Sequence, residues 1–192
     1  MQPTADSPVP DHPVPDRKDW TWTLSERCPE CGLSAGEVPV DELADRAEAA
    51  AVEWVQILTS SPAVTFRPSP IVWSALEYGA HVRDAFRLFD ARLALMLVED
   101  DPVFDNWDQD ETAIAEGYAE ADPDQVAEEL SSAAASFVAR VRALEPSQLD
   151  RPGRRSDGAE FTVTTFIQYL LHDVLHHLWD VTGQQAEALS VP

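Results

Sequence analysis

The sequence predicts an all-α protein, a four-helix bundle with an irregular N-terminal extension. Four segments carry apolar residues at the three- and four-residue spacing of a buried helical face, and hardly any strand pattern lies between them. The two long connections at 61–69 and 99–121 allow an up-up-down-down or a related topology. We expect the extension at residues 1–39 and the bundle domain at residues 40–192.

Residues that cap or break helices bound the first three of these segments. Asp41 is suited to cap the first helix, Pro70 to stand at the start of the second, and the pair Asp122-Pro123 to begin the third. A shorter helix is expected near 111–117, and a loop rich in Pro, Gly and Arg at 146–160. The long helices are therefore expected at 40–59, 70–98 and 123–144.

The N-terminal extension has two parts with different expectations. Residues 1–19 are rich in Pro and Asp and lack a hydrophobic period, which predicts a flexible, extended arm. The segment from Trp20 to Thr23 alternates like a strand, and we expect its tryptophans to face inward. Cys28-Pro-Glu-Cys31-Gly resembles one knuckle of a zinc ribbon. Three interpretations of it stay open: a plain turn, a redox dithiol, or a second metal site completed by His12 or by another subunit.

The charge of the chain excludes several classes of partner. With 13 Lys and Arg against 35 Asp and Glu, the net charge is −22, so phosphate groups of nucleic acids and of anionic membranes would be repelled. No apolar run reaches the length of a membrane span, and the N-terminus lacks the apolar core of a secretory signal. Two cysteines cannot build a disulfide framework. We expect a cytoplasmic protein.

The fourth helix carries the candidate chemistry. The stretch FTVTTFIQYLLHDVLHHLWDVTG, from Phe161 to Gly183, reads as one helix with Thr162 as its N-cap and Gly183 just past its end. His172 and His176 stand four residues apart, which places both imidazoles on one helical face. The helix contains no Lys, Arg or Glu, so this face is expected to be enclosed as well.

Two histidines four residues apart need a third ligand to hold a divalent metal ion. His81 on the second helix is the natural third ligand, and Glu77, one turn earlier, could accept its second N–H. Asp173 and His177 form another pair at the same spacing, which we interpret as the more exposed edge of the helix. Trp54 and Trp73 are expected in the core rather than at a cofactor.

These residues together resemble a known family. The run from Trp73 to His81 (WSALEYGAH), followed far downstream by His172-x-x-x-His176, resembles the DinB/YfiT-like metalloenzymes. Their superfamily includes mycothiol-dependent maleylpyruvate isomerases and bacillithiol S-transferases. The resemblance covers about residues 40–183 and implies an up-up-down-down bundle, often a homodimer. It also implies a divalent metal, zinc or nickel, on His81, His172 and His176 with an open position. The isomerase branch typically has Glu as the first residue of the pair, so this chain is similar instead to the all-histidine branch.

A metal on three neutral histidines would keep its full charge, lower the pKa of bound water toward about 7 and deprotonate a bound thiol. Our first hypothesis is therefore a thiol S-transferase or isomerase that joins a low-molecular-weight thiol such as mycothiol to a small electrophile. Glu77 and Tyr78 would support the site, and Arg154 or Arg155 would hold carboxylates of the thiol or substrate. The alternatives are a metal-dependent hydrolase that activates water, and a non-catalytic metal-binding stress-response protein.

Overall fold

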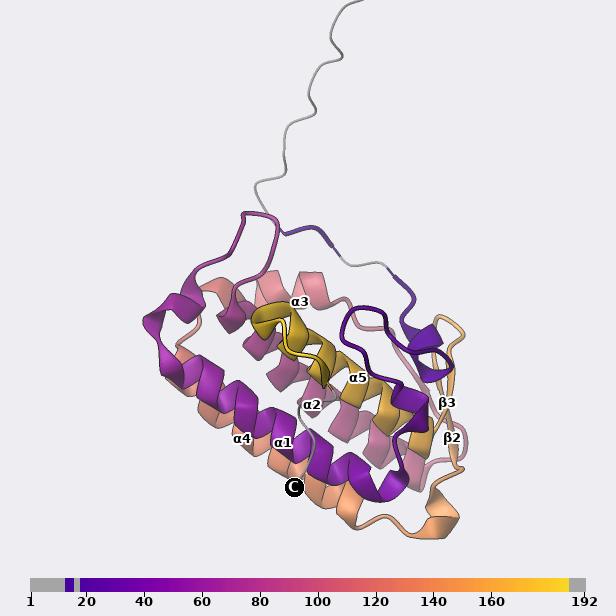
Figure 1. Ribbon diagram of the computed structural model, residues 1–192. Helices are drawn as coiled ribbons and strands as arrows, with labels where there is room; N and C mark the ends of the chain where they lie inside the picture. Colours follow the sequence, from indigo (N-terminus) through magenta and orange to yellow (C-terminus); the bar gives the residue numbers. More distant parts are fainter. Residues whose placement is uncertain (1–12, 16–17, 187–192) are drawn as a thin grey trace, which may run out of the picture.

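Four long helices form the body of the protein in the computed structural model, which describes residues 13–15 and 18–186 (Figure 1). The predicted all-α four-helix bundle is confirmed. A short helix and several 3₁₀ turns lie in the connections. The α-helices are α1 (Val40–Ser60), α2 (Ala75–Val98), α3 (Gln109–Ala115), α4 (Pro123–Arg142) and α5 (Val163–Thr182).

The helices follow one another around the bundle in the order α1, α4, α2, α5, so α1 stands diagonally opposite α2, and α4 diagonally opposite α5. Contacts at the helix ends give the directions of the helices. Arg151, in the connection between α4 and α5, donates to carbonyl oxygens at the end of α2, and its own carbonyl oxygen accepts the first N–H of α5. Arg142, at the end of α4, bonds to Asp45 near the start of α1. Helices α2 and α4 therefore run in one direction and α1 and α5 in the other, an up-down-down-up order instead of the expected up-up-down-down order. The core is closed by large apolar side chains, and the buried Trp54 of α1 also donates its indole N–H to the carbonyl oxygen of Val174 in α5 (3.3 Å).

Helix α2 begins at Ala75, five residues later than Pro70, where the sequence analysis placed its start. The reason is a capping box. The Ser74 hydroxyl accepts the Glu77 backbone N–H (3.2 Å), and the Glu77 carboxylate accepts the Ser74 backbone N–H (2.9 Å). The ends of α5 agree with the prediction, because Thr162 is its N-cap and Gly183 takes the left-handed conformation, with φ at 71°.

A small sheet at one end of the bundle was not predicted. Its strands are β1 (Val103–Phe104), β2 (Pro152–Arg155) and β3 (Glu160–Thr162), in the order β1-β2-β3. β1 pairs parallel to β2, and β2 pairs antiparallel to β3. These strands are two to four residues long and arise from pairing between distant segments. The local pattern of apolar and polar residues therefore does not predict them.

The N-terminal segment from residue 18 to 39 lies across α5 (Figure 1). Instead of the strand-like run expected at Trp20 to Thr23, the chain forms a 3₁₀ turn, η1 (Thr21–Leu24), with a second turn, η2 (Ala35–Glu37), further on. The side-chain amide of Gln168 donates to the carbonyl oxygens of Gly36 (3.2 Å) and Val38 (3.0 Å) and so fastens this segment to α5. Residues 1–12 and 16–17 of the predicted arm, including His12, lie outside the described residues.

Within the described part of the chain, no helix is long and apolar enough to cross a membrane.

Candidate metal centres

Four polar side chains on α5 form two pairs on neighbouring faces. His172 and His176 are one pair, and Asp173 and His177 are the other. One residue step along an α-helix turns the side chain by about 100°, so the second pair points away from the first. The same two turns of α5 therefore present candidate metal ligands on two neighbouring faces of the helix.

The structure groups the candidate ligands differently from the sequence analysis. Among the described residues, His81 lies with Asp173 and His177, whereas His172 and His176 lie with Cys28 and Cys31. Within each group the candidate ligand atoms all lie within 4.8 Å of one another. The Asp173–His177 pair, interpreted as an exposed edge, faces α2, and its side chains are only 30% and 15% exposed. His81 is therefore the partner of this pair and not of His172 and His176.

The first group, which we call the His81 group, consists of His81, Asp173 and His177. The His81 Nε2 atom lies 3.2 Å from Asp173 Oδ2, and the His177 Nε2 atom lies 3.6 Å from Asp173 Oδ1. Burial favours a raised pKa for Asp173, but the two imidazoles outweigh it, so the pKa of this carboxyl is lowered overall. Asp173 therefore places an anionic oxygen between two imidazole nitrogens, where the three atoms could hold a metal ion.

The second ring nitrogens of the two histidines have different surroundings. His177 Nδ1 donates a hydrogen bond to Asp180 Oδ2 (2.8 Å), which leaves the lone pair on Nε2, the atom that faces Asp173. His81 is 1% exposed, and its buried Nδ1 has no hydrogen-bond partner among the described residues. Two histidines and a carboxylate are a donor set that suits a divalent transition metal, so the residues present fit such an ion.

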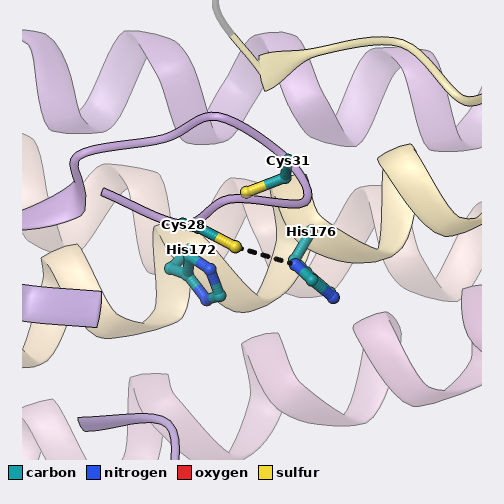
Figure 2. Close-up of side chains that lie close together, drawn as sticks. All are labelled: Cys28, Cys31, His172 and His176. Atoms are coloured by element: carbon teal, nitrogen blue, oxygen red, sulfur yellow. Dashed lines mark hydrogen bonds between the residues drawn. The ribbon is translucent and has the colours of Figure 1, made fainter. Parts of the chain in front are cut away.

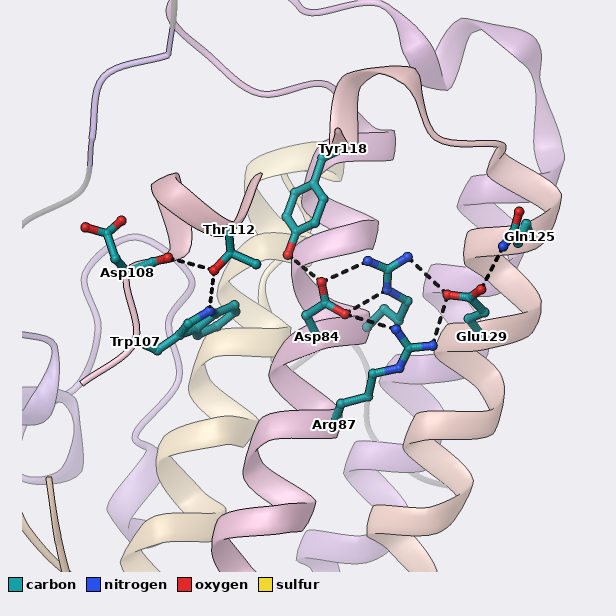
Figure 3. A network of polar contacts seen from close by, with 9 residues as sticks. Asp84, Arg87, Trp107, Asp108, Thr112, Tyr118, Gln125 and Glu129 are labelled. Carbon is teal, nitrogen blue, oxygen red and sulfur yellow. Dashed lines mark hydrogen bonds and ion pairs between the residues drawn. The ribbon is translucent and has the colours of Figure 1, made fainter. Parts of the chain in front are cut away.

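Aromatic rings fix the position of His81. Its imidazole is stacked on the indole of Trp107 with 5.1 Å between ring centroids and only 5° between the planes. Trp107 belongs to the 99–121 connection, where its indole N–H donates to Thr112 Oγ1 (2.7 Å). Tyr118, further along the same connection, donates to Asp84 of α2 (2.6 Å; Figure 3). The long connection thus holds an aromatic cover over the His81 group.

A cavity of about 850 Å³ opens beside this group. Asp173 and His177 form part of its wall, together with Tyr78, Trp107, Arg155 and Tyr169. A volume of this size is typical of ligand sites. Because Asp173 and His177 lie in the wall, a small organic molecule in the cavity would contact these two candidate ligands directly.

The supporting residues expected from the sequence take different places. Tyr78 lines the cavity, and its ring lies 5.0 Å from that of His177. Glu77 does not bond to His81 but accepts hydrogen bonds from Arg67 and Ser74. Burial alone raises the pKa of Glu77, but these bonds outweigh it and lower the pKa overall. Glu77 therefore caps α2 instead of fixing the His81 tautomer.

The two arginines considered for carboxylate binding also separate. Arg155 lines the cavity, forms an ion pair with Asp157 (2.8 Å) and donates to the Tyr169 hydroxyl (3.4 Å). Arg154 pairs with Asp101 on the outside of the sheet and is not part of the cavity wall. Of the two arginines, only Arg155 lies where it could bind a carboxylate of a molecule in the cavity.

The second group, which we call the Cys28 group, consists of Cys28, Cys31, His172 and His176. Figure 2 shows the two thiols on the N-terminal loop facing the two imidazoles on α5. All four residues are buried. Burial lowers the pKa of His172 to about 4, with a smaller effect of the nearby His176, and raises the pKa of Cys31 to about 12, so both side chains are neutral without a cation. Both pairs, Cys28 with Cys31 and His172 with His176, were noted in the sequence. Their contact was not predicted, because the two pairs are far apart along the chain.

Comparison with known proteins agrees with the helical bundle. The family model of the DinB superfamily matches residues 43–181, which is most of the chain. The protein belongs to the DinB superfamily. The matched range contains every ligand of the His81 group and begins after Cys28 and Cys31.

One solved structure with the DinB-like fold is similar to this one. It is YfiT from Bacillus subtilis, described as a probable metal-dependent hydrolase with an unusual four-helix bundle topology. The two chains align with a TM-score of 0.67 and 18% sequence identity, over 75% of this chain and 84% of YfiT. No curated protein matches this DinB chain. At this identity the likeness shows a shared fold.

Proposed function

We propose that this DinB-superfamily protein is a divalent-metal-dependent enzyme whose metal is held by His81, Asp173 and His177. The observation that carries the proposal is the convergence of these three side chains, two of which, Asp173 and His177, line a cavity large enough for a small molecule. Three protein ligands beside an open cavity are typical of a catalytic rather than a structural metal site. The shared DinB fold and the description of YfiT as a probable metal-dependent hydrolase support this proposal.

The chain's own residues supply positioning. Asp180 holds the proton of His177 on Nδ1 and thereby keeps Nε2 available as a ligand. Trp107 holds the His81 ring by stacking and covers it from solvent. Arg155 places a positive charge in the cavity wall, which suits a carboxylate of a bound molecule. A divalent ion at this point would supply Lewis acidity that lowers the pKa of a coordinated thiol or water.

Transfer of a low-molecular-weight thiol to a small electrophile is our first candidate reaction. The thiol loses its proton to solvent, its sulfur forms a bond to the electrophilic carbon, and the leaving group departs with the electrons of the broken bond. Arg155 would orient the thiol through a carboxylate, and Tyr78 and Tyr169 would bound the cavity on either side of the reacting centre. Hydrolysis is the second candidate, favoured by the description of YfiT.

The two reactions can be separated with the same preparation. Metal-loaded protein is mixed with a thiol such as mycothiol and an electrophile, and the loss of free thiol is followed. A parallel sample receives a small ester or amide without thiol. Metal-dependent thiol loss supports transfer, and metal-dependent cleavage alone supports the hydrolase.

The variant Asp173→Asn tests the site itself, with Asp150→Asn as the matched control because Asp150 is exposed on a loop. Asp173→Asn should lose at least about tenfold in metal affinity, since the anionic ligand is replaced by a neutral one. Equal metal affinity and equal turnover in both variants would contradict the proposed centre. Bound metal without turnover on either substrate class would leave the non-catalytic, metal-binding alternative.

A further inference from the structure

We infer that Cys28, Cys31, His172 and His176 form a second, closed metal site that binds zinc and fastens the N-terminal segment to α5. This site is separate from the His81 group in its ligands and in its chemistry. It lies on the neighbouring face of α5 and uses two residues that the family match to residues 43–181 does not include.

The distances agree with tetrahedral zinc. The Cys28 Sγ atom lies 3.7 Å from His176 Nδ1, and the four candidate ligand atoms lie within 4.8 Å of one another. With Zn–S and Zn–N bonds of about 2.3 and 2.05 Å at the tetrahedral angle, a sulfur and a nitrogen ligand would be about 3.6 Å apart. Cys28 and His176 therefore already stand at ligand spacing. Figure 2 shows both thiols on the side of the loop that faces the imidazoles.

The ring nitrogens of the two histidines are also placed to bind a cation. His172 is 2% exposed, and its Nε2 atom is buried without a hydrogen-bond partner among the described residues. Buried polar atoms are almost always partnered, so this nitrogen needs a ligand. His176 Nε2 lies 3.5 Å from the Glu30 carboxylate, which favours a proton on Nε2 and leaves the lone pair on Nδ1, beside Cys28.

The loop that carries the thiols has the shape of a zinc knuckle. The Gly32 N–H donates to the Cys28 carbonyl oxygen, and the Cys28 N–H donates to the Leu33 carbonyl oxygen, both at 2.9 Å. Gly32 takes a left-handed conformation with φ at 79°. This conformation is strained for residues with a side chain, so it favours glycine at this position.

The composition of the group favours zinc over a redox role. Two thiols and two imidazoles in tetrahedral arrangement are the donor set of structural zinc sites. A redox dithiol has to be reached by its partner, but Cys28 and Cys31 are both 0% exposed. With four protein ligands the site has no open position, so we expect it to hold the fold and not to react.

The zinc site would also shape the cavity beside the His81 group. Trp20 and Glu30, from the segment that the zinc would hold, both line this cavity. The Trp20 ring centroid lies 4.8 Å from that of His176 and 5.6 Å from that of His172. Asp173 and His177 directly follow the zinc ligands His172 and His176 in the sequence. Zinc in the Cys28 group would therefore also fix the part of the cavity wall that holds the metal of the His81 group.

The test uses the full chain purified with reductant and without added metal. X-ray absorption at the zinc edge should show sulfur neighbours at about 2.3 Å and nitrogen neighbours at about 2.0–2.1 Å. Replacement by Co²⁺ should produce a sulfur-to-cobalt charge-transfer band. These measurements need no variant, so they decide the question even if a cysteine variant fails to fold.

Three variants then assign the ion. Cys31→Ser should bind zinc at least about tenfold more weakly and lose the charge-transfer band. Ser34→Ala, in the same segment but outside the group, should keep both. His177→Ala should also keep the sulfur-ligated zinc, which separates this site from the proposed enzyme centre. Bound zinc with only nitrogen and oxygen neighbours, equal zinc affinity in Cys31→Ser, or a Cys28–Cys31 disulfide in the reduced preparation would overturn the inference.

Discussion

The imidazoles of His176 and His177 are neighbours in α5, yet their planes stand 76° apart and the rings belong to different ligand groups. One turns toward the thiols of the N-terminal loop and the other toward His81 of α2. A single helix therefore positions a sulfur-containing group and an oxygen-containing group at once. Any change of its rotation about its own axis would disturb both.

Asp180 is expected to control the metal affinity of the His81 group without binding the metal. The variant Asp180→Asn removes the carboxylate that accepts the Nδ1–H of His177 at 2.8 Å. Loss of such a partner typically lowers metal affinity by about 10- to 100-fold. Isothermal titration with a divalent metal measures the change, and Gln184→Ala, at an exposed position past the end of α5, serves as the control. An unchanged affinity in Asp180→Asn would show that the hydrogen bond does not orient the ligand.

Removal of the proposed zinc should loosen the N-terminal segment before it affects the bundle. A chelator would leave the segment from residue 18 to 39 attached mainly by apolar contacts and by the hydrogen bonds of Gln168. We expect limited proteolysis of the chelated protein to cut first within this segment, near Cys28. Mass spectrometry identifies the first cut. A first cut within α2 or α4 would contradict this order of release.

Asp84 is expected to stabilise the cover over the active cavity. It accepts hydrogen bonds from Arg83 (2.8 Å) and from the Tyr118 hydroxyl (2.6 Å; Figure 3). The variant Asp84→Asn should lower the free energy of unfolding by about 2 kcal/mol, because it removes one of the two carboxylates that pair with the buried guanidinium of Arg83 and leaves Glu129 as the other. Denaturant unfolding measures the loss, with Asp150→Asn, at an exposed carboxyl on a loop, as the control.

The stability difference between wild type and Asp84→Asn is also expected to depend on pH. Burial raises the pKa of Asp84, but the hydrogen bonds from Arg83 and Tyr118 outweigh it and lower the pKa below its ordinary value of 3.8. A lowered carboxyl pKa means that the unfolded chain binds the proton more readily, so stability falls as the pH drops. The difference between wild type and Asp84→Asn should be constant above about pH 5 and should shrink below about pH 4. A difference that persists unchanged at pH 3 would contradict the assignment.

A side chain at Gly79 is expected to destabilise the contact between α2 and α1. A Cβ atom at this position of α2 would lie 2.8 and 3.0 Å from the two methyl carbons of Leu58 in α1. Gly79→Ala should therefore destabilise the protein by about 1–3 kcal/mol, although alanine favours helices. In the background of Leu58→Ala the same substitution should cost less, because the methyl group would fill the space left by leucine. Equal costs in the two backgrounds would rule out this contact.

The sequence predicted the long helices well because their apolar periodicity is local information. It also placed the ends of α5, since Thr162 and Gly183 act through neighbouring backbone groups. The start of α2 was wrong because Pro70 competes with the stronger capping box at Ser74. The small sheet was missed because its pairing joins Val103 to Arg154, which are far apart in the sequence.

The candidate ligands were identified, but their grouping was not. His81, His172 and His176 were combined because two histidines four residues apart form the more familiar pattern, and Asp173–His177 was set aside as an edge. The choice between the two pairs depends on the rotation of α5 relative to α2, which is a tertiary property. The role of Cys28 and Cys31 depends on a segment whose docking no periodicity indicates.

The contact between Cys28 and His176 joins residues that are 148 positions apart. During synthesis the thiols leave the ribosome early, whereas their imidazole partners emerge only with the last helix. The same holds for His81, which must wait for Asp173 and His177. The helices of the bundle can begin to pair before α5 arrives, but neither ligand group can be completed without it. Affinity for metal is therefore the last property that the growing chain acquires, and a chain that stops before residue 172 would have neither site.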